Sequence, residues 1–199
     1  MGTLRPNFIV GIGGSAGGLN AYKALLEALP SNTGMAFVIV SHILPTANSQ
    51  LAQILSGHTK MTVIVASTGV PIRANHVYVC PPNADLLIDG YTFKVVSPRI
   101  RRNVQVDLFL TSLAEAMGTR AIGIILSGYD GDGTEGCRRI KAKGGATFAQ
   151  DLSAEVNGMP LSAQASGCID FVLSPGEIAE KLRKMASPSK KKGRKAARG

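Results

Sequence analysis

Short apolar runs alternate with amphipathic stretches along most of the chain, a pattern typical of an α/β fold with a mostly parallel sheet. The apolar runs predict buried strands at residues 8–12, 35–40, 62–66, 121–126, 146–149 and 171–173. Apolar positions three and four residues apart predict helices at 19–29, 48–55, 106–117, 134–143 and 175–185. The sequence therefore predicts a doubly wound sheet flanked by helices.

The stretch from Ile72 to Val96 breaks this rhythm. It contains three short apolar runs, at 77–80, 86–89 and 91–95, and Asp89-Gly90 between the last two is a common hairpin turn. We expect a small antiparallel excursion here, and a strand at His76 that lies away from the main sheet.

Composition favours one folded domain followed by a tail. Of the 199 residues, 45% are hydrophobic, which suffices for one buried core. The net charge is +9, but six basic residues lie in the last ten positions. Removing those six from the 22 leaves 16 basic against 13 acidic residues, a net +3. We therefore expect a domain over residues 1–186 and a disordered basic tail or linker over 187–199, which has no aromatic residue for nucleic-acid stacking.

No apolar run is long enough to cross a bilayer, and the first residues lack the apolar core of a signal peptide. The three cysteines are widely spaced, as expected of free thiols in a reducing compartment. We expect a cytoplasmic protein without direct membrane insertion.

Candidate chemistry gathers where the predicted strands end, which is where open α/β sheets bind ligands. The first strand ends in a glycine-rich loop that fits two motifs. Gly11-x-Gly13-x-x-Ala16 is typical of dinucleotide binding, and Gly13-x-Ser15-x-Gly17 is typical of a serine nucleophile on a tight turn. A plain strand-to-helix turn without chemistry is the third interpretation.

The second strand distinguishes these interpretations. A dinucleotide-binding domain needs an acidic residue at the end of this strand, but the run 35–40 ends in Ser41-His42. A histidine at that place is what a serine nucleophile needs as its general base. We therefore favour Ser15 with His42, and we interpret His58 as a loop histidine.

Two carboxylates compete for the third role. Asp130 and Asp132 follow the strand at 122–126 in a loop that alternates with glycines, and either can face the serine. One alternative is that Asp132 or Thr134 caps the next helix. Another is a calcium loop, but Lys141 stands where such a loop needs a glutamate, so we expect no metal.

These motifs together resemble the catalytic domain of the CheB family, the chemotaxis receptor protein-glutamate methylesterases. The resemblance rests on segments 13–18, 38–45, 106–109, 126–133 and 157–160 and covers about residues 7–185. It implies hydrolysis of glutamate γ-methyl esters on the cytoplasmic helices of receptors, with release of methanol, no cofactor, and possible deamidation of glutamine.

The same resemblance implies the roles of five residues. Ser15 is the nucleophile, His42 the base and Asp132 the orienting acid, while Ala16 and Tyr129 belong to the oxyanion and substrate-binding region. Asp130 is then expected to face solvent or the receptor. Ala16 stands where the family usually has a polar residue, and Tyr129 where it usually has a small apolar one.

Within the family, this chain is most similar to methylesterase domains that begin large fusions with a methyltransferase and signalling modules. We do not expect the receiver domain that is usual in the family. Two other functions remain open: a catalytically weak docking or scaffold domain, which Ala16 favours slightly, and a nucleotide-binding domain.

Overall fold

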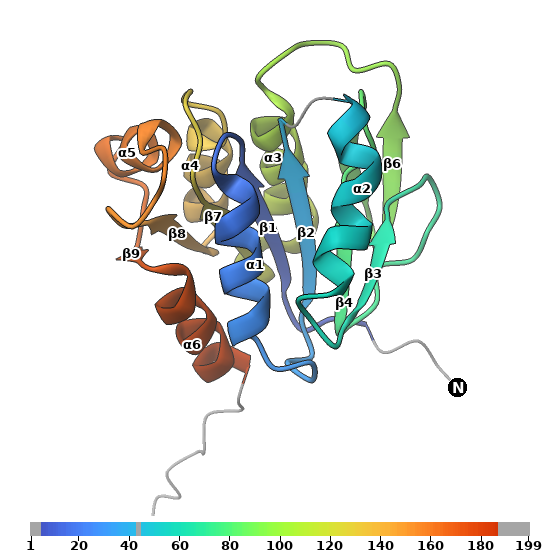
Figure 1. Ribbon diagram of the computed structural model, residues 1–199, viewed down its shortest axis with the longest axis horizontal. Coiled ribbons are helices and arrows are strands. Elements are labelled where there is room, and N and C mark those ends of the chain that lie inside the picture. The colour runs from blue at the N-terminus through green and yellow to red at the C-terminus, as the bar shows by residue number, and fades with distance from the viewer. Residues whose placement is uncertain (1–4, 43–44, 187–199) are drawn as a thin grey trace, which may run out of the picture.

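The computed structural model describes residues 5–42 and 45–186 (Figure 1). The predicted basic tail lies outside the described residues. The strands are β1 (Ile9–Gly14), β2 (Ala36–Ser41), β3 (Thr62–Val65), β4 (His76–Val79), β5 (Asp85–Asp89), β6 (Thr92–Val96), β7 (Ala121–Ile125), β8 (Ala146–Gln150) and β9 (Phe171–Leu173). The α-helices are α1 (Gly18–Ala28), α2 (Pro45–Ser56), α3 (Gln105–Met117), α4 (Thr134–Ala142), α5 (Gly158–Ala165) and α6 (Pro175–Ala186).

Seven strands form one parallel sheet in the order β3-β4-β2-β1-β7-β8-β9, and β5 and β6 form a separate antiparallel pair. The predicted fold class is therefore confirmed. Since β1 lies between β2 and β7, the loops that follow these three strands meet at one edge of the sheet.

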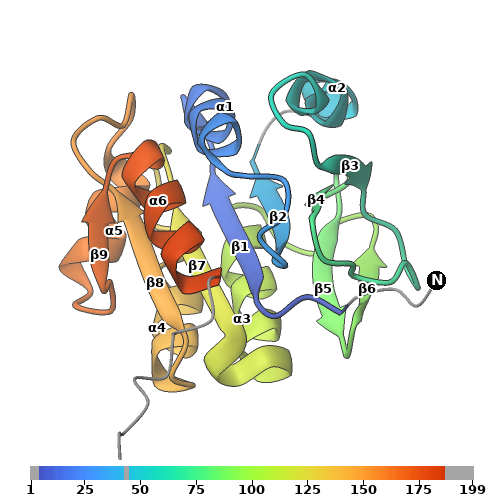
Figure 2. The same ribbon diagram turned by 90° about the horizontal axis from the view of Figure 1, so that it is seen from below.

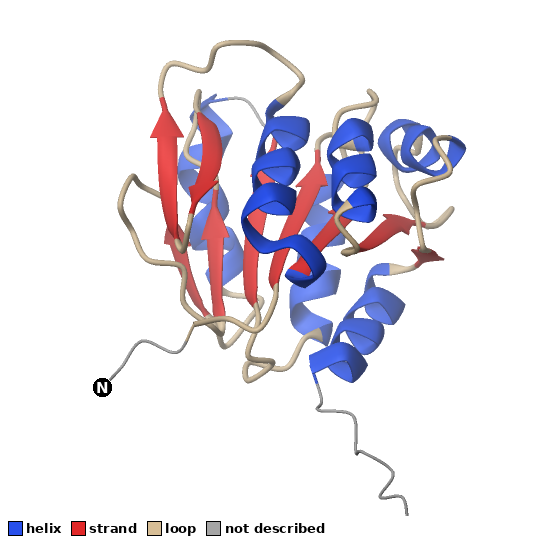
Figure 3. Cartoon of the chain, turned by 180° about the vertical axis from the view of Figure 1, so that it is seen from behind, coloured by secondary structure: helices blue, strands red, loops and turns tan. Residues whose placement is uncertain are grey.

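Two apolar layers hold the helices to the sheet. Alternate residues of a strand point to opposite faces, so Phe37 and Ile39 belong to the layer that also contains residues of α1, α2 and α6, whereas Val38 and Val40 belong to the layer that contains residues of α3 and α4. Figure 2 shows α1 and α2 on one side of the sheet and α3 and α4 on the other, and Figure 3 shows the second face. Both faces of the central strands are buried, as expected of a parallel sheet.

The placement of β4 corrects one prediction. His76 begins a strand that lies inside the main sheet, parallel to both β2 and β3, whereas β5 and β6 form an antiparallel pair. Val77, Tyr78 and Val79 are all buried, so this short run is a core strand. Its apolar pattern is the same for either direction of pairing, so the sequence alone did not reveal the direction.

Helix α5 was not predicted, because its first turn contains Gly158 and Pro160, two poor helix formers. Proline is tolerated there because the first turn has no intrahelical use for its missing N–H. Helix α2 begins at Pro45, earlier than the predicted residue 48.

Candidate functional site

The structure joins His42 to Asp132. His42 follows the end of β2, and its Nε2 lies 2.5 Å from Oδ2 of Asp132, which comes from the loop between β7 and α4. Both side chains are almost fully buried, with 6% and 0% exposed. A short contact between an imidazole and a carboxylate fixes the ring orientation and its tautomer, leaving Nδ1 as the nitrogen free to act as a base.

The Asp132 carboxylate is held by the start of helix α3. Its Oδ2 accepts the N–H of Val106 at 3.0 Å, and its Oδ1 accepts the N–H of Asp107 at 2.8 Å. These are two of the N–H groups that a helix leaves unpaired in its first turn, and α3 has no side-chain cap of its own. The helix end therefore stabilises the ionised carboxylate and fixes its position.

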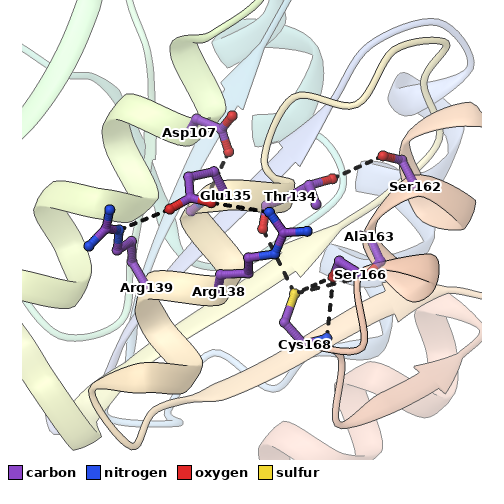
Figure 4. Close-up of polar contacts among 10 residues, drawn as sticks. Asp107, Thr134, Glu135, Arg138, Arg139, Ser162, Ala163, Ser166 and Cys168 are labelled. Carbon is purple, nitrogen blue, oxygen red and sulfur yellow. Dashed lines mark hydrogen bonds and ion pairs between the residues drawn. The ribbon is translucent and has the colours of Figure 1, made fainter.

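Helices α3 and α4 are also linked in the reverse direction. The carboxylate of Asp107 in α3 accepts the N–H of Gly136 in the first turn of α4, at 2.8 Å. Figure 4 shows the start of α4 between Asp107 on one side and Ser162 of α5, whose hydroxyl lies 3.2 Å from Thr134 Oγ1, on the other. The interpretation that Asp132 or Thr134 caps the next helix is therefore wrong: the N-cap of α4 is Gly133, without a side-chain cap, and Asp132 instead binds the start of α3.

Ser15 lies directly after β1, in the turn before α1. Its N–H donates to the carbonyl of Ser127 at 2.8 Å, and the N–H of His42 donates to the carbonyl of Gly14 at 3.3 Å. These bonds bring the ends of β1, β2 and β7 together around the serine. Its hydroxyl forms no hydrogen bond to any residue in the described part of the chain, so the contact between Ser15 and His42 is not made in this state, as is common in free enzymes.

Gly128 permits the close approach of the acid loop to the serine. A Cβ at this position would lie 3.1 Å from Cβ of Ser15 and 2.1 Å from Sδ of Met159. Gly133, directly after Asp132, has a φ of +92°, a left-handed conformation that favours glycine. These two glycines explain how a carboxylate of this loop turns back over the sheet.

The predicted oxyanion residues flank Ser15. The main-chain N–H groups of Ala16 and Tyr129 donate to no residue among those described, so both are free to bind a ligand oxygen. The carbonyl of Ala16 accepts the Ser127 hydroxyl at 2.7 Å, which fixes the orientation of this peptide. The Tyr129 side chain is 76% exposed.

Asp130 departs from its expected position. One carboxylate oxygen lies 3.4 Å from Nδ1 of His42, although 33% of the side chain remains exposed. Its other oxygen accepts the N–H of Asp132 at 3.1 Å, closing a local turn. The prediction that Asp130 faces solvent or the receptor therefore holds for only part of the side chain, because this turn directs the carboxylate toward the histidine.

The pKa of His42 is raised above its usual value. Burial alone lowers this pKa, but the hydrogen bond and charge of Asp132 and the charge of Asp130 outweigh burial, and the charge of Arg99 opposes them least. The imidazolium form of His42 therefore persists to higher pH than in an unperturbed histidine.

The segment before α5 supports the site, and its structural role was missed at the sequence level. Ser127 is fully buried, and its hydroxyl accepts the N–H of Val156 at 3.0 Å. Gly128 donates to Val156 and accepts from Met159. The resemblance of residues 157–160 to the CheB family indicated that this segment matters, but it did not indicate these contacts.

Within residues 5–42 and 45–186, no three His, Cys, Asp or Glu side chains are arranged to hold a metal ion. The helices of this part are also too short or too polar to cross a bilayer.

Known proteins share this arrangement of loops and sheet. The family model described as CheB methylesterase matches residues 10–182. A relative from Leptospira interrogans named putative protein-glutamate methylesterase/protein-glutamine glutaminase is 36% identical over 173 residues, covering 85% of this chain and 90% of the relative. A relative from Hydrogenovibrio crunogenus with the same name, without "putative", is 34% identical over 181 residues; the match covers 87% of this chain but only 48% of that longer protein.

A solved structure is also similar. The CheB methylesterase catalytic domain of Thermotoga maritima superimposes with a TM-score of 0.81 at 30% identity, covering 89% of this chain and 98% of that domain. The residues matched by the family model, 10–182, include all three loops.

Proposed function

This chain belongs to the CheB methylesterase family, and from that premise we propose that it hydrolyses glutamate γ-methyl esters on chemotaxis receptors through Ser15, His42 and Asp132. The observation that carries the proposal is the buried contact between His42 and Asp132 beside the Ser15 loop. Removing an imidazole and a carboxylate from water costs free energy. A catalytic role explains why the pair is buried, whereas docking to a receptor does not require it.

The geometry supports the following reaction. Ser15 Oγ attacks the ester carbonyl carbon while Nδ1 of His42 accepts the serine proton. The N–H groups of Ala16 and Tyr129 bind the oxyanion. Collapse breaks the bond to the methoxy group, which takes the proton from His42 and leaves as methanol. Water, activated by His42, then hydrolyses the glutamyl ester on Ser15 and releases the glutamate carboxylate.

The same steps deamidate a glutamine side chain, with ammonia in place of methanol as the leaving group. The two relatives named above carry both activities in their names, and we propose both here. No step needs a cofactor.

An acidic partner fits the surroundings of the site. Arg99, Arg101 and Arg102 follow β6 in the loop that arches over the carboxyl edge of the sheet (Figure 1). None of the three forms an ion pair with a described residue. Buried Asp85 anchors the loop from below by accepting the N–H of Ile100 at 2.9 Å.

A fixed loop with unpaired arginines supports a substrate surface rich in carboxylates, such as the cytoplasmic helix of a receptor with several glutamate sites. We propose that the reaction takes place in the cytoplasm, with fused or separate methyltransferase and signalling domains as further partners.

The deciding experiment measures methanol release from a methylated receptor by the wild type and by Ser15→Ala. We expect Ser15→Ala to lose at least about 10⁴-fold in turnover while its circular dichroism spectrum and melting temperature stay close to the wild type. Unchanged methanol release by this variant would contradict the proposal, and no release by the wild type would favour the docking domain.

The charge of the loop is tested by the double variant Arg101→Glu/Arg102→Glu. We expect KM for the methylated receptor to rise at least about tenfold with little change in kcat, because both side chains are exposed and neither touches the triad. Lys60→Glu, at the opposite edge before β3, is the matched control. An equal effect of the two charge reversals would remove the loop from substrate binding.

A further inference from the structure

Two carboxylates flank His42, one at each ring nitrogen. Asp132 lies 2.5 Å from Nε2, and Asp130 lies 3.4 Å from Nδ1. We propose that Asp130 is a positioning residue that competes with Ser15 for Nδ1 and holds the free site in a resting form with His42 protonated. This inference rests on the proposed function, in which Nδ1 accepts the serine proton.

Apart from Asp130, Nδ1 of His42 has no polar partner among the described residues. Nδ1 is buried and forms no hydrogen bond with the residues described, while Ser15 Oγ does not reach it. The neutral imidazole that binds Asp132 through Nε2–H carries a lone pair on Nδ1, and this lone pair faces the carboxylate of Asp130. Repulsion between them disfavours the neutral base, whereas a proton on Nδ1 converts the same contact into an attraction.

The other charged groups do not cancel this effect. Among the described residues, those that act on His42 are Asp132 and Asp130 from the loop after β7 and Arg99 from the loop after β6. Arg99 is the only cation of the three, and its effect is the smallest. Strands β1 and β2, whose ends adjoin His42, contribute no charged group to this set.

Asp130 and Asp132 differ in how firmly they are held. Asp132 is fully buried and bound through both oxygens to the N–H groups of α3. Asp130 is one-third exposed, and among the residues that the structure describes it forms one hydrogen bond, to the N–H of Asp132. A rotation of the Asp130 side chain toward solvent therefore frees Nδ1 without disturbing the acid. When a substrate carbonyl binds at Ser15, the attacking hydroxyl donates its hydrogen bond to Nδ1 and displaces Asp130 from it.

The direct test is an NMR titration of the imidazole of His42 in the wild type and in Asp130→Asn. The chain has only three histidines, so the His42 signals can be assigned with a His42→Gln spectrum. Asparagine keeps the local turn, because its side-chain oxygen still accepts the N–H of Asp132. We expect the pKa of His42 to fall by about one pH unit, the size expected for a charge removed at this distance from a largely buried ring.

The control is Asp89→Asn, which removes an exposed carboxylate from the hairpin turn far from this contact. We expect it to leave the His42 titration unchanged. Asp130→Glu restores the charge and is expected to restore most of the raised pKa. An unchanged titration in Asp130→Asn, or an equal fall in Asp89→Asn, overturns the proposal. This measurement needs no substrate, so it separates failure of this inference from failure of the proposed esterase activity.

The functional readout is the pH profile of kcat/KM for methanol release. Only neutral His42 accepts the serine proton, so lowering its pKa moves the acid limb of the profile to lower pH. We expect the midpoint in Asp130→Asn to fall by about one unit, which makes the variant up to about tenfold faster than the wild type at pH values well below both midpoints. A fall in the NMR pKa without movement of the acid limb would show that Asp130 does not hold the resting state, and would also overturn the proposal.

Discussion

Two histidines of this molecule contact a carboxylate at nearly the same distance, in very different surroundings. His42 Nε2 lies 2.5 Å from Asp132, and His58 Nδ1 lies 2.6 Å from Glu27. The first pair is almost fully buried, whereas the side chains of the second are 28% and 58% exposed. Distance alone therefore does not identify a catalytic pair.

The difference lies in what else holds the carboxylate. Asp132 accepts two main-chain N–H groups of a helix start in addition to the histidine, and its position is fixed. Glu27 leaves the exposed side of α1 near the amino edge of the sheet, and water competes for both partners. A buried charge with complete hydrogen bonding is available for chemistry, while an exposed pair adds little to either stability or function.

The largest contrast should come from the histidines themselves. His42→Gln is expected to reduce kcat for methanol release by at least about 10⁴-fold, because His42 is the base of the proposed reaction. His58→Gln should leave kcat within about twofold of the wild type. Steady-state assays of both variants on one receptor preparation make the comparison, and similar losses in the two would contradict it.

The carboxylates give the next contrast. Asp132→Asn places an NH₂ group against His42 or against a helix N–H, so it favours the wrong tautomer and leaves a buried donor without an acceptor. We expect a loss of about 10⁴-fold in kcat and about 1–3 kcal/mol in the free energy of unfolding. Glu27→Gln should leave kcat unchanged and cost less than about 1 kcal/mol. Urea titrations with activity assays measure both quantities. If Asp130→Asn reduces kcat at saturating substrate more than Asp132→Asn does, the acid is misassigned.

The raised pKa of His42 predicts a pH dependence of stability. Protonated His42 stabilises the fold fully below its unfolded pKa of about 6.5, and this contribution is lost as pH rises through the higher folded pKa. The stability advantage of the wild type over His42→Gln should therefore shrink as pH rises through that interval, by about 1.4 kcal/mol for each unit of difference between the two pKa values. Chemical unfolding at several pH values measures it, and an advantage that grows with pH would reverse the sign of the argument.

Salt should produce the smallest contrast. Raising the salt concentration from about 0.05 M to 1 M shortens the screening length from over 10 Å to about 3 Å. The small stability difference between the wild type and Glu27→Gln should then approach zero, because this pair is exposed. The difference for Asp132→Asn should persist. Unfolding titrations at the two salt concentrations test this, and equal salt sensitivity of the two variants would argue against the role of burial.

The sequence predicted that Ser15 and His42 lie at the same edge of the sheet, for a simple physical reason. Carboxyl ends of neighbouring parallel strands share one edge of a sheet, so residues that directly follow buried runs lie close together. The choice between Asp130 and Asp132 remained open, because glycines on both sides allow the loop many paths. It depends on the N–H groups of α3, whose approach is a tertiary event that no local pattern encodes.

Other features were hidden for related reasons. The direction of β4 depends on which strands it joins rather than on its own apolar run. Helix α5 begins with Gly158 and Pro160 and forms because Met159 is buried beside Gly128. The link between α3 and α4 joins Asp107 to a residue 29 positions away, beyond the reach of capping motifs in sequence.

The position of β1 in the sheet also has a consequence for how the protein acquires activity as it folds. β1 pairs with β2 early in the chain, but also with β7, which brings Ile9 beside Ala121. Residues 1–120 contain the serine and the histidine but not Asp132, which lies 90 positions beyond His42. Contacts of such long sequence separation close large loops and are slow to form. The catalytic set is therefore completed only when the two halves of the sheet join along β1, so turnover reports the end of folding rather than any earlier stage.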